Sequence, residues 1–403
     1  MRKSLFSGFV AVIAASVWLA SPRLSLAQEP PPPVEPPAPT EPPPPSADPA
    51  PVEATPISEA EAQPTLALKA AVGVGIRAEL VFDPARDEPQ DSPVYTVNHN
   101  LRPYISGQVH DYVKFEGNLD SANGDIVVLD AILKLEFHDY FNLWLGRFLP
   151  PSDRANLSGP YFQNAWTYPG GVHAYPSVYA GRNDGLAIWG QVNGGQFKWQ
   201  VGAFDMGGGG TPDPRLAARL TLNVLDPEPG YYNSSTYYGS KDVLAFGAVV
   251  QHKPEPDDAP DQQADTLWNL DALYETSFAG AGTLDIEGAF YGFGGADAGT
   301  SFFLLGSFLF EQKLGFGQLQ PMLRLQRAAW SDGDTFSAFG MALAAPPDGD
   351  ASLLTFDVGL HYIISGHNAR LAATLSHTSF SVDGVDEAEN DTIFILGGQV
   401  QAF

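Results

Sequence analysis

The chain has 403 residues, with 21 Lys and Arg against 47 Asp and Glu, a formal net charge of -26, and no cysteine. These counts exclude a disulfide-stapled secreted domain, a thiolate metal site and an electrostatic nucleic-acid binder. Charged residues make up only 17 % of the chain while Gly, Pro and aromatic residues are plentiful, which suits neither a long-helix protein nor an ordinary cytosolic enzyme.

Residues 1–27 are predicted to be a signal peptide. Arg2 and Lys3 precede an apolar run over residues 5–20, and small residues lead to a cleavage point after Ala27. An N-terminal anchor helix is the alternative, but the apolar run is short and a cleavage site follows it. We therefore expect the chain to be exported across the inner membrane and its signal peptide to be removed.

Residues 28–64 form a Pro-rich acidic segment. They hold 15 of the 35 prolines and seven acidic residues, with no Lys or Arg. Such a composition cannot bury apolar surface, so we expect a disordered, extended linker. Its simplest role is that of a spacer, and the alternative is an arm that contacts peptidoglycan or another partner. Without the signal and the linker, 18 Lys and Arg and 40 Asp and Glu remain, so residues 65–403 carry a net charge of -22.

The rest of the chain alternates with period two, and it contains no apolar stretch long enough for a membrane helix. Leu354, Phe356 and Val358, for example, alternate with Thr355 and Asp357. Alternation of this kind places one face of a strand in an apolar environment and the other face in a polar one. Most segments have about 9–13 residues, the length with which a tilted strand crosses a bilayer. A soluble β-sandwich also alternates, but sixteen strands exceed its usual size.

This pattern predicts an all-β fold for residues 65–403, a transmembrane antiparallel β-barrel of 16 strands. The predicted strands span residues 66–82, 98–109, 112–120, 126–137, 141–148, 184–192, 197–205, 215–225, 241–252, 266–276, 282–293, 301–313, 317–329, 353–365, 369–381 and 391–403.

The connections between the segments alternate in length. A bacterial outer-membrane barrel has short turns on the periplasmic side and longer loops outside. With the first strand starting at the periplasmic side, even-numbered connections should be short, and most are, while the fifth connection, residues 149–183, which is the third of the outer loops, is the longest. Residues 226–240 break the rule, because this connection falls on the periplasmic side yet has fifteen residues. The predicted register is therefore open to an error of one hairpin at this point.

Two His-Asp-Tyr repeats, at residues 110–112 and 138–140, stand one hairpin period apart. We interpret them as turns that begin with Asp and are followed by aromatic residues of the membrane interface. A metal site is the alternative.

The polar phase of each strand is expected to line the lumen when the apolar phase faces lipid. Because closure places the first strand beside the last, Arg77, Arg102, Arg324 and Arg370 fall on one basic arc of the wall. Acidic residues of the tenth and eleventh strands form a second arc, and opposed charges of this kind create a transverse field. The other charged residues of the polar phase are Glu79, Lys114, Glu116, Asp130, Lys134, Glu136, Lys198, Arg215, Arg219, Asp271, Glu275, Asp285, Glu287 and Asp357.

Residues 143–154 (LWLGRFLPPSDR) and 181–185 (GRNDG) resemble the phosphate-selective porin O and P family, in which a strand ending in Gly-(Gln/Arg)-Phe leads into a long third loop. Residues 226–232 (DPEPGYY) and 364–368 (ISGHN) are similar to hairpins of that family. The resemblance spans most of residues 66–403. It implies a trimeric outer-membrane pore whose third loop folds inward as a constriction.

We therefore predict an outer-membrane porin of a Gram-negative bacterium, a water-filled channel for passive diffusion of ions and small hydrophilic solutes. Its expected partners are lipid, lipopolysaccharide and two further copies of the chain, and no enzymatic activity, metal, cofactor or nucleic acid is expected. The residues expected to line the pore or its constriction are Arg77, Arg102, Lys114, Lys134, Arg147, Asp153, Arg154, Arg182, Asp184, Arg215, Arg219, Asp285, Glu287, Arg324 and Arg370.

The acids of the predicted outer loops bear on ion preference. They attract cations and repel anions within about 8 Å at physiological salt, whereas the arginines of the lumen act in the opposite direction. Aromatic residues of the third loop, such as Trp166 and Tyr175, either guide sugars by stacking or pack the loop against the wall. A non-conducting barrel with an envelope-attachment role is the alternative to a porin, and a hydrolase is disfavoured because no catalytic motif occurs.

Overall fold

The computed structural model describes residues 69–84, 95–122, 124–177, 181–206, 213–255, 264–295, 298–331, 335–338, 341–344, 349–384 and 390–402. The predicted signal peptide and Pro-rich linker lie outside the described residues, as do most of the acids assigned to the outer loops.

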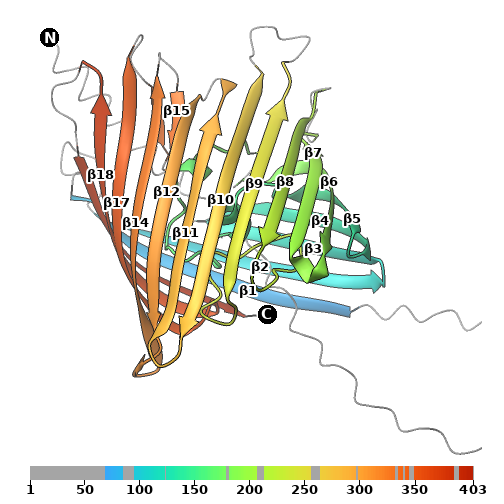
Figure 1. Ribbon diagram of the computed structural model, residues 1–403, viewed down its shortest axis with the longest axis horizontal. Coiled ribbons are helices and arrows are strands. Elements are labelled where there is room, and N and C mark those ends of the chain that lie inside the picture. Colours follow the sequence, from blue (N-terminus) through green and yellow to red (C-terminus); the bar gives the residue numbers. More distant parts are fainter. Residues whose placement is uncertain are drawn as a thin grey trace, which may run out of the picture.

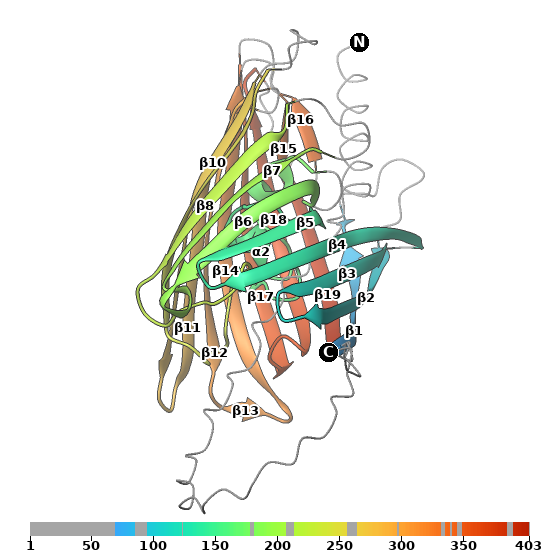
Figure 2. The same ribbon diagram turned by 90° about the vertical axis from the view of Figure 1, so that its right-hand side faces the viewer.

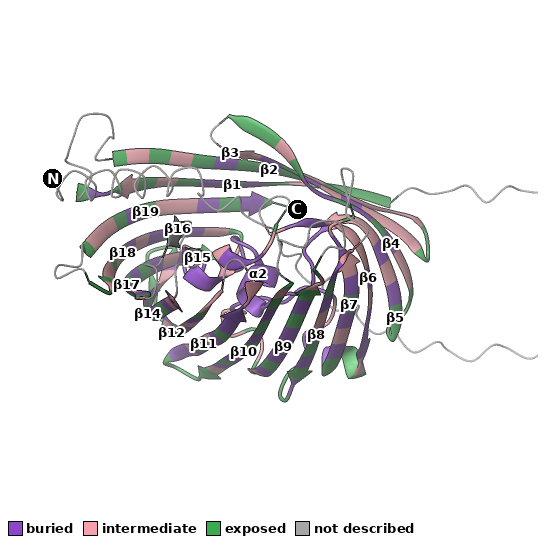
Figure 3. Ribbon diagram, turned by 90° about the horizontal axis from the view of Figure 1, so that it is seen from above, coloured by how far each residue is buried: buried purple, intermediate pink, exposed green. Residues whose placement is uncertain are grey.

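Sixteen strands close into one antiparallel barrel, which surrounds further chain segments (Figures 1 and 3). Each strand pairs with the barrel strands before and after it, and β1 also pairs with β19, so that Val74 lies between Pro103 and Ala402. A closed barrel satisfies the backbone groups of every strand, which a structure inside lipid requires. The predicted all-β, 16-stranded antiparallel barrel is confirmed.

The barrel strands are β1 (Lys69–Phe82), β2 (Tyr95–His110), β3 (Val113–Ala122), β4 (Asp125–His138), β5 (Phe141–Phe148), β6 (Asn183–Val192), β7 (Phe197–Phe204), β8 (Arg215–Asn223), β9 (Val243–Lys253), β10 (Asp265–Phe278), β11 (Gly282–Phe293), β12 (Gly299–Phe310), β14 (Gly317–Ser331), β17 (Asp350–Ser365), β18 (Ala369–Val382) and β19 (Asn390–Ala402). The other elements are α2 (Arg154–Ser158), η2 (Gly170–Ala174), η3 (Asn193–Gly195), β13 (Lys313–Leu314) and the hairpin of β15 (Thr335–Ala338) and β16 (Met341–Ala344).

The strands match the predicted segments within a few residues. The register is also right at the connection that was in doubt, because β8 and β9 pair from Asn223 with Ala245 onward. The connection between them, residues 224–242, is therefore a genuine long turn. Both His-Asp-Tyr repeats lie at tight turns, as predicted, and Tyr112 and Tyr140 are exposed there.

Side chains alternate between an exposed apolar phase and a buried phase along the strands. In β17, Leu354, Phe356 and Val358 are 43–47 % exposed, whereas Thr355 and Asp357 are 1 % exposed. Charged side chains inside and leucines outside invert the arrangement of a water-soluble protein. The outer wall is therefore suited to lipid, as the transmembrane barrel requires.

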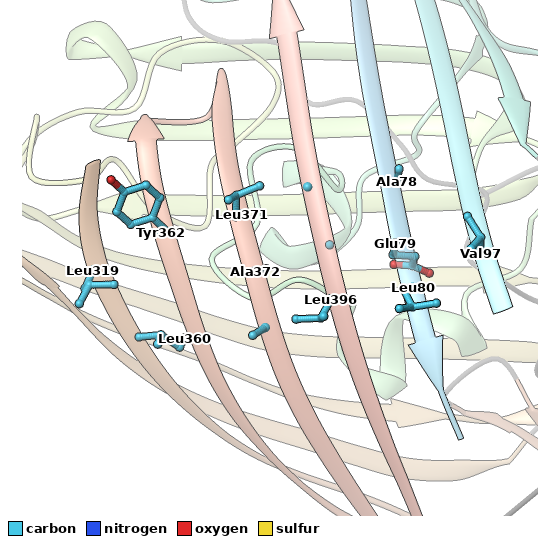
Figure 4. A pocket seen from close by; sticks show the side chains of 13 residues that line it. Ala78, Glu79, Leu80, Val97, Leu319, Leu360, Tyr362, Leu371, Ala372 and Leu396 are labelled. Carbon is cyan, nitrogen blue, oxygen red and sulfur yellow. The ribbon is translucent and has the colours of Figure 1, made fainter. Parts of the chain in front are cut away.

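The seam between the last and first strands carries the same apolar surface. A shallow hollow of about 570 Å³ crosses it, lined by residues of β14, β17, β18, β19, β1 and β2. Leu360, Leu371 and Leu396 lie along this hollow on neighbouring strands (Figure 4). Ala78 and Ala373 widen it because their side chains are small.

Among the described residues, no helix has the length and apolar character needed to cross a membrane.

The barrel wall has a long side and a short side. β5 and β7 have 8 residues each, whereas β17 has 16. In Figure 2, β3–β5 also run much more obliquely than β10 and β12. The short side therefore reaches less far along the barrel axis than the long side does.

Candidate functional site

The charged side chains of the inner wall lie in two opposed arcs. Arg77, Arg102, Arg324 and Arg370 point inward from β1, β2, β14 and β18, and each is at most 4 % exposed. These strands lie within the run β14, β17, β18, β19, β1 and β2, which crosses the seam. Asp271, Glu275, Asp285 and Glu287 point inward from β10 and β11 and are at most 5 % exposed. This is the arrangement that the alternation predicts, but the low exposure indicates that these groups face protein rather than open water.

Ion pairs across the wall neutralise many of these charges. Cross-strand and near-strand pairing of opposite charges stabilises a barrel wall and lowers the cost of burying each member. The pairs are Arg102 with Asp120, Lys114 with Glu136, Lys134 with Glu116, Arg182 with Asp130, Arg215 with Asp265, Arg219 with Asp271 and Arg324 with Asp357.

The third loop, which connects β5 to β6 over residues 149–182, folds into the barrel. Figure 3 shows α2 of this loop inside the ring of strands. Asp153 caps α2 by accepting a hydrogen bond from the backbone N–H of Ala155 at 3.0 Å. Every residue over 152–166 is buried, and the named side chains of this stretch are at most 3 % exposed. The inward third loop that the family resemblance implied is therefore present.

The basic arc holds the third loop by its backbone. Arg77 donates to the carbonyl of Trp166 at 2.7 Å, and Arg370 donates to that of Gln163 at 2.6 Å. Arg324 donates to the carbonyl of Thr167, also at 2.7 Å. Hydrogen bonds from charged donors are the stronger ones. These arginines therefore act as clamps on the loop.

Glycines of the wall make room for the aromatic residues of the loop. A Cβ atom on Gly397 of β19 would lie 2.2 Å from the indole of Trp166, and one on Gly75 of β1 would lie 2.7 Å from the ring of Tyr161. The Arg77 guanidinium also lies 4.0 Å from the Trp166 ring, within cation–π range. The third-loop aromatics are thus packed against the wall, as one of the two sequence interpretations expects.

On the acidic side, the loop is held through Asp153. Its carboxylate accepts a hydrogen bond from the hydroxyl of Tyr291 at 2.8 Å, and its backbone N–H donates to the hydroxyl of Tyr175 at 3.1 Å. Burial and the nearby Asp271 raise the pKa of Asp153 to about 6. The free energy of unfolding therefore decreases as the pH rises from the pKa of Asp153 in the unfolded chain, near ~4, to its pKa of about 6 in the folded chain.

The fourth turn, which connects β8 to β9 over residues 224–242, also folds into the barrel, from the opposite end. The ring of Tyr231 stacks on Trp144 of β5 with centroids 4.7 Å apart, and its hydroxyl donates to the carbonyl of Leu149 at 3.0 Å. Glu228, Asn233 and the residues up to Thr236 are at most 7 % exposed. A connection on the short-turn side therefore also contributes to filling the lumen.

The two inward segments meet at an ion pair between Arg154 and Glu228. The guanidinium donates two parallel hydrogen bonds of 2.6 Å to the carboxylate, and a third of 2.7 Å to the carbonyl of Ser234. Both side chains are at most 1 % exposed. Nearby, the backbone N–H of Ser235 donates to the carbonyl of Phe162 at 3.1 Å, and the Ser235 hydroxyl lies 3.1 Å from that of Ser158.

The charge of this ion pair persists over the ordinary pH range. Burial alone would raise the pKa of Glu228, but the charge and hydrogen bonds of Arg154 outweigh burial and lower that pKa to about 2. Burial acts to lower the pKa of Arg154, and the charge of Glu228 raises it instead. The depressed pKa of Glu228 means that its stabilising contribution is present above its unfolded pKa near ~4.3 and is lost only as the pH falls through about 2.

Two of the predicted pore-lining residues lie on the outer face instead. Arg147 and Asp184 form a bidentate ion pair with two 2.7 Å hydrogen bonds between β5 and β6. They share the phase of Leu145 and Leu186, and all four border an outward hollow of about 460 Å³. The alternation itself places them outside, because the inward phase of β5 is that of the buried Trp144.

The remaining predicted residues are inside but do not form one site. Lys114 lies toward the turn end and is 38 % exposed, whereas Arg215 lies at the loop end. Asp285 and Glu287 lie in the acidic arc, where Glu287 accepts a hydrogen bond from the Ser235 hydroxyl at 3.0 Å. Sequence analysis missed Glu228, Tyr231 and Ser235. Their sequence signals were the unexpected length of the connection that carries them and, for Glu228 and Tyr231, the family-like motif of residues 226–232.

No group of three or more histidine, aspartate and glutamate side chains in the described part of the chain is arranged to hold a metal ion.

Comparisons with known proteins bear on the fold. No protein-family model and no curated protein matches the sequence. OprB of Pseudomonas putida matches with a TM-score of 0.55 at 10 % identity, over 83 % of this chain and 94 % of that one. An anion-selective porin from Comamonas acidovorans and a loop-deletion mutant of OmpT, an outer membrane protein of Vibrio cholerae, each have a TM-score of 0.51 at 13 % identity, over 83 % of this chain and 100 % of theirs. At these identities the likeness is one of fold, and it agrees with a 16-stranded barrel.

Proposed function

We propose that this chain is an outer-membrane channel through which ions and small hydrophilic solutes pass passively, without enzymatic chemistry or a cofactor. The observation that carries the proposal is a closed barrel with leucines outside and opposed basic and acidic arcs inside. One of the structures similar in fold, from Comamonas acidovorans, is named as an anion-selective porin. The finer assignment, to the phosphate-selective porin O and P family, rests on the short motifs of residues 143–154, 181–185, 226–232 and 364–368.

The channel is expected to prefer cations. The basic arc is used up in clamping the third loop and in ion pairs, whereas Asp350 and Asp383 are exposed at the loop end. Reversal potentials in a salt gradient across a planar bilayer measure this preference. A preference for anions would show that the arginines of the lumen outweigh the acidic mouth.

A non-conducting barrel with a role in envelope attachment is the second candidate, and the filled interior favours it. Both inward segments are buried over their inner stretches, and the third-loop aromatics that a sugar-preferring porin needs are covered. Conductance in a planar bilayer separates the candidates. A protein that inserts as a folded barrel and gives stepwise currents supports the channel, and one that inserts and stays silent in every variant described below supports attachment.

We further propose that the chain forms a homotrimer and that the short side of the barrel is its contact face. An ion pair in lipid is costly, yet Arg147 and Asp184 lie among Val128, Leu145 and Met206 on the outer wall. Contact with a second copy of the chain would remove this pair from lipid. We also propose that the barrel contacts lipopolysaccharide of the outer leaflet. The chain is exported with a cleaved signal peptide, its N-terminus lies in the periplasm, and its linker contacts peptidoglycan there.

Substituting Leu for Arg147 is expected to weaken the trimer by about 1–3 kcal/mol, because Asp184 would remain unpaired at the contact. Native gels run at increasing temperature measure the dissociation of trimers into folded monomers. The matched control is Arg327→Leu, which removes an outward arginine of β14 that has no ion-pair partner among the described residues. Equal dissociation temperatures for both variants would contradict the proposed contact face.

A further inference from the structure

The starting observation is that two segments enter the barrel from opposite ends and touch at its centre. The third loop enters after β5 and the fourth turn enters after β8, and these two strands end at opposite ends of the barrel. Their contacts include the Arg154–Glu228 pair, the Ser235 N–H to Phe162 carbonyl bond and the Ser158–Ser235 hydroxyl contact. With both segments in place, the inner stretch of the third loop is not open to water.

The third loop is the more firmly held of the two. Guanidinium groups of β1, β14 and β18 donate to its carbonyls, and Asn164 and Tyr175 hydrogen-bond to side chains of β12 and β10. Its anchors therefore surround the lumen. A movement of this loop has to break several charge-assisted hydrogen bonds at once.

The fourth turn is held to the wall through fewer and mostly uncharged donors. The side-chain amide of Gln200 donates to the carbonyl of Tyr231 at 2.5 Å, and the Lys198 ammonium donates to the carbonyl of Tyr232 at 3.1 Å. Glu275 accepts hydrogen bonds of 2.7 Å from the N–H groups of Tyr237 and Gly239. Among the described residues, the ion pair of the turn is with the third loop, through Glu228.

The tip of the turn is polar throughout. Residues 233–236 read Asn-Ser-Ser-Thr, and each is at most 7 % exposed. A permanent filling of a protein interior is usually apolar, because buried hydroxyl and amide groups contribute little net stability. Hydroxyl and amide groups also exchange protein partners for water at small net cost. The composition of this tip thus suits a segment that leaves the lumen and is hydrated when it does so.

We infer that the fourth turn is a movable plug and that the Arg154–Glu228 ion pair is the latch that holds it closed. Withdrawal of the turn toward the end at which it enters opens the lumen between the basic and acidic arcs. The inference rests on the proposed channel function. Because Glu228 keeps its charge down to about pH 2, mild acid leaves the latch closed, and opening requires a force or a ligand that separates the two segments.

The absence of native cysteine allows a direct test of the plug. The hydroxyl oxygens of Ser158 and Ser235 lie 3.1 Å apart, so a Ser158→Cys/Ser235→Cys pair is placed to form a disulfide between the two segments after a small adjustment. Single-channel recording of the oxidised double variant is expected to show at least a tenfold lower open probability than the same protein after reduction. The single Ser158→Cys variant controls for the substitution itself, and its behaviour should not depend on reductant.

The latch is tested by Glu228→Gln, which keeps the shape of the side chain and removes its charge. The variant leaves Arg154 buried and unpaired in the closed state, so we expect at least a tenfold higher open probability than in the wild type. Asp226→Asn, an exposed carboxylate in the same turn, is the matched control and should behave like the wild type.

The outcomes separate the inference from the function on which it rests. If the oxidised and reduced double variants conduct equally, the plug is refuted while the channel stands. If only Glu228→Gln fails to differ from Asp226→Asn, the latch is refuted. If no variant conducts although heat-modifiable gels show folded barrels in the bilayer lipid, the proposed channel is refuted and the plug with it.

Discussion

Replacing residues 227–241 with a two-residue Asn-Gly turn is expected to give a barrel that conducts with several times the wild-type single-channel current. The flanking chain is already paired as a hairpin, since the N–H of Asp226 donates to the carbonyl of Asp242 at 2.9 Å. A type I′ turn fits such a two-residue connection. The replacement removes the inward turn and its contacts with Arg154, Ser158 and Phe162 of the third loop, so we expect the central lumen to become water-filled.

The control for this replacement is a shortened hairpin between β12 and β14. Residues 311–316 are all exposed, so shortening that hairpin removes chain without emptying the lumen. Planar-bilayer recording in the same salt compares both variants with the wild type. An unchanged conductance after removal of residues 227–241 would mean that the turn does not limit passage.

The second large effect is expected for Arg370→Ala, which removes a clamp of the third loop. The guanidinium donates to the carbonyls of Pro160, Gln163 and Asn164, at 3.3, 2.6 and 3.2 Å. Hydrogen bonds from charged donors contribute about 1.5–3 kcal/mol each, and the three bonds share one cation, so we expect a loss of about 2–5 kcal/mol. The loss should appear as a lower unfolding temperature and as faster chymotrypsin cleavage at Tyr161 and neighbouring aromatic residues.

Arg327→Ala is the control for Arg370→Ala, because Arg327 is an outward residue of the neighbouring barrel wall and its side chain is exposed. Its unfolding temperature should stay within the experimental error of the wild type. Equal cleavage rates and unfolding temperatures for the two variants would show that the third loop does not depend on the basic arc.

Sequence alone predicted the barrel well because the information is local. Period-two alternation identifies a strand and its faces within about five residues, and sixteen such segments with alternating connection lengths leave few other folds. The inward direction of the Arg77 and Arg370 side chains was also predictable, because each alternates with apolar residues of its own strand. The same alternation places Arg147 and Asp184 on the outer face. They were predicted to line the pore because they adjoin the third loop in sequence, and that prediction did not follow the alternation.

The filling of the lumen could not be predicted in the same way. Whether a connection turns inward depends on partners from distant parts of the chain, such as Glu228 for Arg154 or Gly397 for Trp166. Residue type does not reveal such partners. The long connection at residues 226–240 was visible as an anomaly, but its length was equally consistent with a register error.

The structure also changes what the charges of the lumen mean. Arg77, Arg324 and Arg370 were expected to act on solutes, yet their guanidinium groups are occupied by carbonyls of the third loop. A field across the lumen is still expected, because Arg77 and Arg370 donate to neutral carbonyls and keep their positive charge. Solutes would experience it only in the space that the fourth turn vacates.

The closed interior is tested most directly by chemical labelling of Ser158→Cys in the folded, membrane-inserted protein. Ser158 is 0 % exposed at the contact of the two inward segments, and a water-soluble maleimide reagent reacts only with a thiol that it can reach. We expect this thiol to be protected in the otherwise wild-type chain and to become reactive when Glu228→Gln is added. Labelling as fast as that of an exposed Ser365→Cys without the second substitution would contradict a plugged lumen.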